Sequence, residues 1–385
     1  MRLRVVQVIT GLEVGGAERL LLNTLRHLPP EEFDSHVVCL YNNGSIGREI
    51  EALGIPVTDV GMRSRNDLAG VLRLRKLLKQ LRPQILHTHL FRANLWGRLA
   101  GATLRIPVVV SSEHSLTRTH FEGRPRTRGL TWLDTAMSRL CDAVIAVSES
   151  TRDLLRENGV APGKIVLIPN AIDTMLYRDQ DGASVRRELQ LESAKVVTAV
   201  GRLVPQKNHR LLLDALPLVL KRVPRVKLLI VGSGPLQAEL EAHAAAFLQG
   251  SIVFLGTRGD IPQIMAASDV VVLPSSYEPF GMVLVEAMAG ARPVVGTRVD
   301  GIPELIDDGV TGTVVPPHDP AALSDAILSI LLDDSRAASM GAAGQRNSAR
   351  FDIRVSTALL RDLYHRLYAG RGPCGNRPAM EDSKS

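Results

Sequence analysis

The stretch DVVVLPSSYEPFGMVLVEAMAGARPVVGT (269–297) contains one complete strand–helix–strand pattern. DVVVLP (269–274) and RPVVGT (292–297) are short runs with valine on both faces, and the helical pattern between them begins near Gly281 and ends at Gly290. Strands that are apolar on both faces and alternate with helices are typical of a parallel sheet covered on two sides. This stretch therefore predicts an α/β fold.

The same pattern extends outward in both directions. Further strand-like runs occupy residues 5–10, 35–40, 83–89, 106–112 and 142–148, and then 195–201, 226–232, 252–256 and 313–317. The polar stretch between the two series, 174–194, predicts a hinge. We therefore expect two Rossmann-like, doubly wound parallel-sheet domains over 1–173 and 174–354. A helical pattern near 355–370 has no strand after it, and residues 371–385 are expected to be disordered.

Composition narrows the class of protein. The 385 residues include 46 Lys and Arg against 40 Asp and Glu, and 45% are hydrophobic, which excludes a wholly disordered chain. Three cysteines do not make a disulfide scaffold and fit a reducing compartment. No apolar run approaches the ~18 residues of a membrane span, and no signal-peptide cleavage pattern follows the first strand. A cytoplasmic location is expected, with peripheral attachment to the inner face of the cell membrane as an option.

Several loops that follow predicted strands carry residues suited to an anionic ligand, which binds beyond the carboxyl ends of parallel strands. Gly15 and Gly16 precede the first helix, where the backbone can approach an anion, although a plain tight turn explains them equally well. Arg202 and Lys207 lie on the loop after the first strand of the second domain and suit a diphosphate. Gly232 lies in the glycine-rich turn VGSGP (231–235), which is a weak signal by itself.

Two carboxylates flank the start of the helix in 269–297. Glu278 lies on the loop before it, and Glu286 lies inside an apolar helix, where an unpaired carboxylate is costly. We therefore expect Glu286 to accept hydrogen bonds from donors such as vicinal ribose hydroxyls, the alternative being a buried salt bridge with an arginine. Backbone N–H groups in the first helical turn are expected to bind phosphate. The residues around this turn are Phe280, Gly281, Met282 and Val283.

Histidines follow two strands of the first domain. His114 comes after VVVSSE (108–113) and is a candidate general acid or base. His87 and His89 share one face of a strand and could imitate a metal-binding pair. No acidic or cysteine cluster accompanies them, so no metal is expected. Asp179-Gln180-Asp181 has the form D-x-D, but it lies in the predicted hinge and is not counted as a metal site.

Positive charge is concentrated in residues 58–130, which contain fourteen Lys and Arg but four Asp and Glu. Much of it lies in 63–82 and 118–128. Such a segment fits an anionic membrane surface or an anionic acceptor, and the alternative is a solvated basic face. Nucleic acid is not an expected partner, because the segment has few aromatic residues and no known binding motif.

Taken in order, six motifs of this chain resemble those of the retaining nucleotide-sugar glycosyltransferases called group 1 or family four. The resemblance covers residues 3–370 and implies the GT-B fold, with the donor bound mainly by the second domain and the last helix crossing back onto the first. The motifs are GGAER (15–19), IPNAID (168–173), GRLVPQK (201–207), VGSGP (231–235), EPFGMVLVEAMAG (278–290) and GIPELIDDGVTG (301–312).

The resemblance also implies roles. Glu278 would contact the donor sugar and Glu286 the ribose. Arg202 and Lys207 would neutralise the diphosphate, with Gly16 near that phosphate. His114 would lie near the transferred sugar.

The family uses cations and helix dipoles in place of a metal, so no metal or other cofactor is expected. Retention is ascribed to attack on the same face, with the departing phosphate helping to deprotonate the acceptor. Asp300 and Ala171 stand where the family commonly has glycine, which could alter the sugar preference.

The resemblance implies a UDP-sugar donor, with a GDP-sugar as the next choice, and a glycan, lipid-linked or small polar acceptor. Two alternatives use the same kind of fold. One is a UDP-N-acetylglucosamine 2-epimerase, and the other is a sugar-nucleotide-binding protein without catalytic activity.

Overall fold

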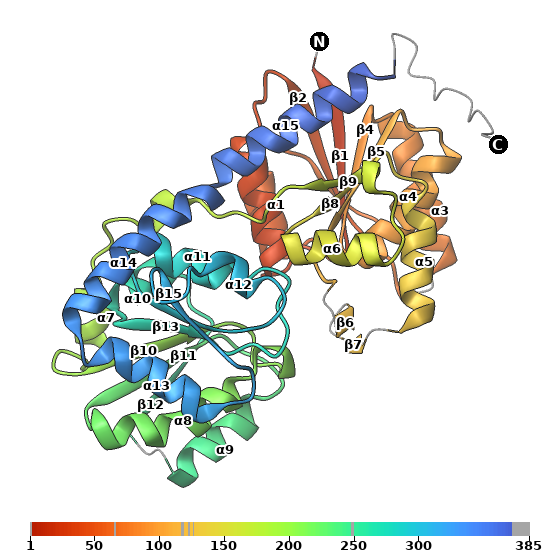
Figure 1. Ribbon diagram of the computed structural model, residues 1–385. Coiled ribbons are helices and arrows are strands. Elements are labelled where there is room, and N and C mark those ends of the chain that lie inside the picture. Colours follow the sequence, from red (N-terminus) through yellow and green to blue (C-terminus); the bar gives the residue numbers. More distant parts are fainter. Residues whose placement is uncertain are drawn as a thin grey trace. The chain divides into compact units, whose positions relative to one another are not determined.

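The computed structural model describes residues 2–64, 67–116, 119–121, 124–125, 127–247 and 250–371. The chain divides into two compact units, one made of Met1–Asn170 with Ile353–Ser385 and the other of Ala171–Asp352 (Figure 1). The chain thus leaves the first unit slightly earlier than the predicted boundary at 173. Residues 372–385, for which disorder was predicted, lie outside the described residues.

The first unit contains a seven-stranded sheet with the order β3-β2-β1-β4-β5-β8-β9. All of its strand pairs are parallel, as predicted. Its strands are β1 (Leu3–Ile9), β2 (Phe33–Cys39), β3 (Val57–Asp59), β4 (Ile85–His89), β5 (Val108–Glu113), β8 (Ala143–Ala146) and β9 (Ile165–Leu167). Two short strands, β6 (His120–Phe121) and β7 (Arg124–Pro125), pair separately as an antiparallel hairpin.

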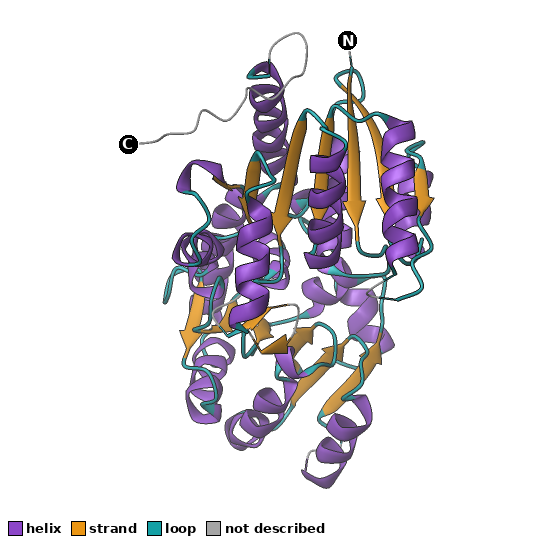
Figure 2. Ribbon diagram, turned by 90° about the vertical axis from the view of Figure 1, so that its right-hand side faces the viewer, coloured by secondary structure: helices purple, strands orange, loops and turns teal. Residues whose placement is uncertain are grey.

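Helices cover both faces of this sheet (Figure 2). They are α1 (Gly16–His27), α2 (Ser45–Glu51), α3 (Leu68–Leu81), α4 (Phe91–Thr103), α5 (Arg128–Ser138), α6 (Glu149–Glu157), the 3₁₀ turn η1 (Pro162–Lys164) and α15 (Ile353–Ala369). α15 returns to this unit, and its Leu360, Leu363 and Tyr364 pack in one core cluster with Leu3 and Val5 of β1. An amphipathic helix that follows no strand thus completes a sheet face.

The second unit contains a six-stranded sheet with the order β12-β11-β10-β13-β14-β15, again all parallel. Its strands are β10 (Lys195–Val200), β11 (Val226–Val231), β12 (Ile252–Gly256), β13 (Val270–Leu273), β14 (Val294–Thr297) and β15 (Gly312–Val315). Its helices are α7 (Ala183–Glu188), α8 (His209–Arg222), α9 (Gln237–Phe247), α10 (Ile261–Ala267), α11 (Met282–Ala289), α12 (Ile302–Leu305), α13 (Pro320–Leu331) and α14 (Asp334–Ser348), with 3₁₀ turns η2 (Thr174–Leu176), η3 (Pro205–Lys207) and η4 (Ala349–Phe351).

The stretch 174–194, predicted as a hinge, is part of the second unit. Val185 of α7 and Leu191 are buried in a core cluster with Val196 and Leu229. The stretch has few apolar residues and a helix of less than two turns, which is too little to produce a visible period.

Counted from its own first strand, the second sheet has the doubly wound order 3-2-1-4-5-6, and the first sheet has the same order with a seventh strand added, 3-2-1-4-5-6-7. The order reverses between β1 and β4 in the first unit and between β10 and β13 in the second. Ligands of such sheets bind beyond the carboxyl ends of the strands at this switch point. The loops after these four strands are therefore the places to look for a site.

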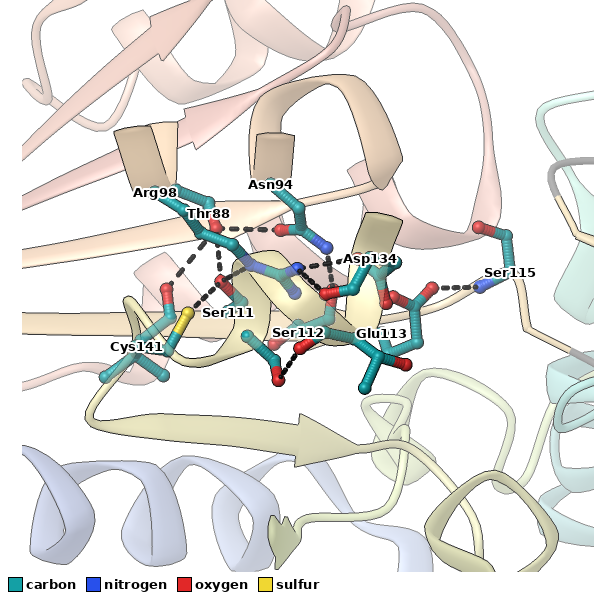
Figure 3. A network of polar contacts seen from close by, with 12 residues as sticks. Thr88, Asn94, Arg98, Ser111, Ser112, Glu113, Ser115, Asp134 and Cys141 are labelled. Atoms are coloured by element: carbon teal, nitrogen blue, oxygen red, sulfur yellow. Dashed lines mark hydrogen bonds and ion pairs between the residues drawn. The ribbon is translucent and has the colours of Figure 1, made fainter. Parts of the chain in front are cut away.

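A buried polar network joins α4, β4, β5 and α5 in the first unit (Figure 3). The Arg98 guanidinium is fully buried and donates to Asp134 Oδ1 at 2.6 Å and to Ser111 Oγ at 2.9 Å. Thr88 Oγ1 donates to Asn94 Oδ1 at 2.7 Å. Burial by itself lowers the pKa of Arg98, but the Asp134 carboxylate outweighs it and the pKa is raised.

This burial corrects the interpretation of the basic segment. Arg98 was counted in its charge excess, yet it lies inside the unit and cannot meet an external anion. Arg73 is also engaged, donating to Asp67 and to the carbonyls of Val60 and Gly61. Arg65, Arg118 and Arg126 lie outside the described residues. In the part of the chain that the structure describes, no helix combines the length and apolarity needed to cross a bilayer.

The Arg98–Asp134 pair yields a stability prediction. Arg98→Met removes the cation and leaves the Asp134 carboxylate, 9% exposed, without its ion-pair partner. We expect the free energy of unfolding to fall by about 3–5 kcal/mol, measured by urea denaturation.

Two comparisons make this test specific. Lys76→Ala, at an exposed position on α3, should change the free energy of unfolding by less than about 0.5 kcal/mol. Adding Asp134→Leu to Arg98→Met should recover most of the loss, because no uncompensated charge remains buried. A double variant as unstable as Arg98→Met would show that packing, and not the unpaired charge, causes the loss.

Candidate functional site

The loops at the carboxyl edge of the second sheet are joined by backbone hydrogen bonds. The loop after β10 bonds to the loop after β11 through Leu203 N–H and Ser233 O, 3.0 Å apart. It also accepts from the loop after β13, where Ser276 N–H donates to Gln206 O at 2.8 Å. The loop after β14 donates to the loop after β13 through Gly301 N–H and Glu278 O at 3.0 Å. Four strands that are neighbours in the sheet, β11, β10, β13 and β14, thus carry loops that form one continuous surface.

Gly232 is required where two of these loops meet. Its φ is +128°, and a Cβ at this position would lie 2.1 Å from the Gly201 carbonyl oxygen. Neither the backbone conformation nor the space admits a side chain. The glycine-rich turn, a weak signal in sequence, therefore brings the loop after β11 against the loop that carries Arg202.

Lys207 and Glu278 meet in this surface. Lys207 Nζ lies 2.5 Å from Glu278 Oε2, and the side chains are 16% and 10% exposed. Ser275 Oγ donates to the same carboxylate oxygen at 3.1 Å. The Glu278 carboxylate is therefore fixed by a cation and a hydroxyl, and a charge-assisted bond of this kind is stronger than a neutral one.

Arg202 lies beside this pair. Its side chain is exposed, and its guanidinium has no ion-pair or hydrogen-bond partner among the residues described by the structure. Burial raises the pKa of Tyr277, Arg202 opposes that increase, and Glu278 adds to it, so both charged groups lie near the Tyr277 hydroxyl. A free guanidinium next to a fixed lysine is suited to bind an oxyanion with two parallel hydrogen bonds.

Asp300 clasps the loop that carries Glu278. Its Oδ2 accepts from the Glu278 backbone N–H at 3.0 Å, while Gly301 N–H donates to the Glu278 carbonyl. Asp300 has a φ of +37°, in the left-handed region that asparagine, aspartate and glycine tolerate best. Glycine and aspartate can both adopt this conformation, but only aspartate has a carboxylate that can accept from Glu278 N–H.

Helix α11 starts on the same loop. Gly281, at its N-cap, has a φ of +104°, and Gly290 follows its last residue, so the predicted limits of this helix are confirmed. Phe280 is buried edge-on against Phe351 and supports the loop from below. Met282 and Val283 are half-buried in the first turn.

Glu286 is half-buried in α11, although the sequence around it is apolar. The helix is short and its neighbours Val285 and Ala287 take the buried positions. A carboxylate in this setting can accept hydrogen bonds from a ligand without the full penalty of burial.

A cavity in the first unit adjoins the ends of β1, β4 and β5. His87, His89, His114, Gln7 and Asn170 are among its lining residues. Burial, with a smaller contribution from His114, lowers the pKa of His87 to about 3. Burial lowers the pKa of His114 to about 4, and the Asn170 side chain offsets part of that decrease. The pKa of His89 is also lowered by burial and by its histidine neighbours.

Metal binding finds no geometric support at these histidines. The rings of His87 and His89 lie 4.1 Å apart, and all four ring nitrogens are within hydrogen-bonding distance of other side chains. Across the described ranges, no group of three or more His, Cys, Asp and Glu is arranged to hold an ion. Asp181 Oδ1 accepts from the Ala183 backbone N–H at the start of α7, which is a capping role.

Comparison with known proteins identifies the family. The sequence profile described as "Glycosyl transferases group 1" matches residues 194–333, and that described as "Glycosyltransferase Family 4" matches residues 14–176. The alpha-D-kanosaminyltransferase of Streptomyces kanamyceticus is 30% identical, over 71% of this chain and 75% of that protein. The chain belongs to the group 1 glycosyltransferases.

Two further proteins resemble this glycosyltransferase over nearly its whole length. The UDP-Gal:alpha-D-GlcNAc-diphosphoundecaprenol alpha-1,3-galactosyltransferase of Escherichia coli is 26% identical, over 91% of this chain and 94% of that protein. The crystal structure of Anabaena HepE in complex with UDP-glucose has a TM-score of 0.85 and 25% identity, covering 94% of this chain and 100% of that one. With its two Rossmann-like units, the glycosyltransferase has the GT-B fold.

The structure brings together most of the residues predicted for the second unit. Arg202, Lys207 and Glu278 lie on the interlocked loops with Gly232, and α11 begins from the same surface. In the first unit, Gly15 and Gly16 lie at the start of α1 after β1, with extended backbone at Gly15. His114 follows β5 and lines the cavity of that unit.

Sequence reasoning missed the residues that support Glu278. Ser275 was given no role in advance, and Asp300 was expected only to alter the sugar preference. Ser275 gave no signal, because a serine after a strand is common. Asp300 was detectable, since a residue that replaces glycine and can adopt a positive φ is a candidate for a special backbone role.

Asp300 gives a prediction about the donor site. Asp300→Gly keeps the backbone conformation but removes the acceptor for Glu278 N–H. We expect UDP-sugar turnover to fall roughly tenfold, the effect of about 1.4 kcal/mol, because a hydrogen bond to a charged group is worth about 1.5–3 kcal/mol. The measurement is kcat/KM, with thermal melting to verify folding.

Asp300→Asn is the matched variant, because its side-chain oxygen can still accept from Glu278 N–H and asparagine tolerates the same φ. It should retain most of the wild-type kcat/KM. Equal activity in Asp300→Gly and wild type would show that Gly301 alone holds the loop.

Proposed function

We propose that this chain is a retaining, metal-independent glycosyltransferase that moves a hexosyl group from a UDP-sugar to a hydroxyl of a lipid-linked acceptor. The observation that carries the proposal is the Lys207–Glu278 ion pair at the switch point of the second sheet, with Arg202 on the same loop as Lys207. Retention follows from the resemblance to a retaining family. The HepE structure, which holds UDP-glucose, supports the donor class.

In the proposed reaction, the bond between the sugar C1 and the UDP β-phosphate oxygen breaks, and C1 bonds to the acceptor oxygen on the same face. The acceptor proton passes to the departing phosphate. Negative charge grows on that phosphate, so Arg202 and Lys207 stabilise the transition state more than the ground state. With two cations and the start of α11 available, the charge is neutralised without a metal.

Glu278 and Glu286 are proposed to accept hydrogen bonds from donor hydroxyls. The Glu278 carboxylate is already fixed by Lys207 and Ser275, so little side-chain entropy is lost when a ligand binds. Glu286, half-buried in α11, is proposed to bind the ribose. Lys207 is therefore proposed to bind the diphosphate and Glu278 the sugar, and their ion pair holds both side chains in place.

His114 is proposed to contact a hydroxyl of the ligand in the first unit. Its pKa of about 4 makes it neutral at physiological pH and a weak base. We therefore assign it hydrogen bonding and not proton abstraction, which differs from a general-base role. Gly15 and Gly16, at the start of α1, remain predicted anion contacts.

Arg202→Ala tests the assignment of the leaving-group charge. We expect kcat with UDP-glucose or UDP-galactose to fall by roughly 100-fold or more, because a transition-state charge contact is lost. Arg210→Ala removes a similarly exposed arginine from the same unit and should leave kcat near wild type.

The assay is run in EDTA and repeated with added Mg²⁺ or Mn²⁺. Wild-type activity should be the same in both conditions, since the cations of the chain neutralise the diphosphate. A wild-type enzyme that is inactive in EDTA and restored by either ion would overturn the metal-independent mechanism, and a folded Arg202→Ala enzyme with normal kcat would overturn the role of Arg202.

The choice of a lipid-linked acceptor rests on α3 and on one relative. The E. coli relative is named for a diphosphoundecaprenol-linked acceptor. On α3, Leu68 and Leu72 are 70% and 68% exposed, and Arg75, Lys76 and Lys79 are exposed on the same helix. Exposed leucines beside basic side chains suit the headgroup region of an anionic bilayer.

Replacing Arg75, Lys76 and Lys79 with Ser tests this surface. Each cation near an anionic bilayer contributes about 1 kcal/mol, so the loss of three should weaken binding roughly 100-fold. The measurement is co-sedimentation with vesicles of phosphatidylglycerol and phosphatidylcholine at low salt. Binding should also weaken as added salt shortens the Debye length.

The matched control replaces Lys221, Arg222 and Arg225 with Ser, an equal change of charge on exposed positions of the second unit. It should bind vesicles like the wild type. If the wild type does not sediment with anionic vesicles, a water-soluble acceptor becomes the better hypothesis. The relatives described above are transferases, so the epimerase alternative gains no support.

A further inference from the structure

Six buried or partly buried side chains of the first unit form an unbroken chain of hydrogen bonds. The chain begins on β5, passes through α15 and β1, and ends after β5 at the cavity. Its members, in order, are Ser112, His87, Tyr364, Gln7, His89 and His114, with successive separations of 2.8, 2.6, 3.1, 2.9 and 3.3 Å.

Gln7 gives this chain a direction, because one end of its amide can only donate and the other can only accept. Gln7 Nε2 donates to the Tyr364 hydroxyl, so Gln7 Oε1 faces His89 and accepts from its Nε2–H. A neutral imidazole carries one N–H, so His89 Nδ1 is an acceptor. The group facing that nitrogen is His114 Nε2, which must therefore carry the hydrogen.

The other half of the chain is consistent with this direction. The Tyr364 hydroxyl, having accepted from Gln7, donates to His87 Nδ1, and His87 Nε2–H then donates to Ser112 Oγ. Each ring nitrogen along the chain thus has one role. The lowered pKa of all three histidines keeps them neutral, as this arrangement requires.

Once His114 holds its proton on Nε2, its Nδ1 can only accept. This nitrogen is shielded from solvent, and neither it nor the Asn170 side-chain oxygen makes a direct hydrogen bond with a described residue. The Asn170 side chain is nevertheless a neighbour of His114, because it offsets part of the decrease in the pKa of that histidine. Both residues line the cavity. Two acceptors that line one cavity are satisfied by hydroxyl groups and not by another acceptor.

We propose that Gln7 and His89 are positioning residues that hold His114 in a single tautomer, protonated on Nε2, so that its Nδ1 accepts a hydrogen bond from a hydroxyl of the ligand. The inference rests on the proposed function for the identity of that ligand as a sugar or lipid-linked glycan. The tautomer itself is a property of the ligand-free protein. Tyr364 sets the orientation of Gln7 from α15.

The test is long-range ¹H–¹⁵N correlation NMR on the full chain labelled with ¹⁵N-histidine, at neutral pH, with His114 assigned from His114→Gln. Nitrogen shifts distinguish a protonated from an unprotonated ring nitrogen. We expect wild-type His114 to carry its hydrogen on Nε2. Gln7→Met removes both ends of the amide and should give His114 a mixture of tautomers, and UDP release from a UDP-sugar should fall about tenfold.

Gln84→Met is the matched control. Gln84 Nε2 donates to the Tyr368 hydroxyl at 2.8 Å, so the variant removes the same kind of bond to α15 without touching the histidines. It should leave the His114 tautomer and UDP release unchanged. If Gln7→Met retains the single Nε2–H tautomer, the proposal is overturned.

The wild-type spectrum decides the matter even where Gln7→Met does not fold, since a wild-type His114 protonated on Nδ1 contradicts the proposal directly. Transfer is measured separately. A wild type with the expected tautomer that releases no UDP from any UDP-sugar contradicts the proposed function alone. An active wild type with mixed tautomers contradicts this inference alone.

Discussion

All strands of the seven-stranded and the six-stranded sheet run in the same direction, and this constraint places the strand-to-helix loops of each of these sheets at one edge. Residues far apart in sequence, such as Arg202, Glu278 and Asp300, meet because their strands are neighbours or nearly so. The reversal of strand order between β10 and β13 then separates the first turns of two helices and leaves room for a ligand. The chemistry of the second unit is a consequence of this geometry.

In the first unit, the alternation of side chains along β4 separates two polar systems. His87 and His89 point to the face that α15 covers, and Thr88 between them bonds to Asn94 of α4 and to Ser111. β5 does the same, with Ser111 bonded to Arg98 and Ser112 to His87. Because successive side chains along β4 and β5 point to opposite faces of the sheet, this strand pair carries a separate polar network on each face. A buried polar group is tolerated on each face because it has partners there.

Much of the fold could be predicted from the sequence, because valine- and isoleucine-rich runs mark buried parallel strands. The short α7 was missed, since six residues show no period. Arg202, Lys207 and Glu278 were predicted to lie on loops that follow strands, and the structure has them on the loops after β10 and β13. The sequence shows that Arg98 is charged but not that its side chain is buried, so Arg98 was counted among the surface cations.

Other details depend on tertiary contacts that sequence spacing does not encode. The half-buried position of Glu286 could not be derived from the sequence, because apolar neighbours in sequence are not always neighbours in space. Gln7 carries no recognisable signal in a strand, and its partner Tyr364 is separated from it by nearly the whole chain. The first unit therefore has a consequence for biosynthesis: its sheet leaves the ribosome early, but the apolar face around Leu3 and Val5 stays uncovered until α15 is made. During that interval this apolar face is exposed, and exposed apolar surface of this kind favours aggregation.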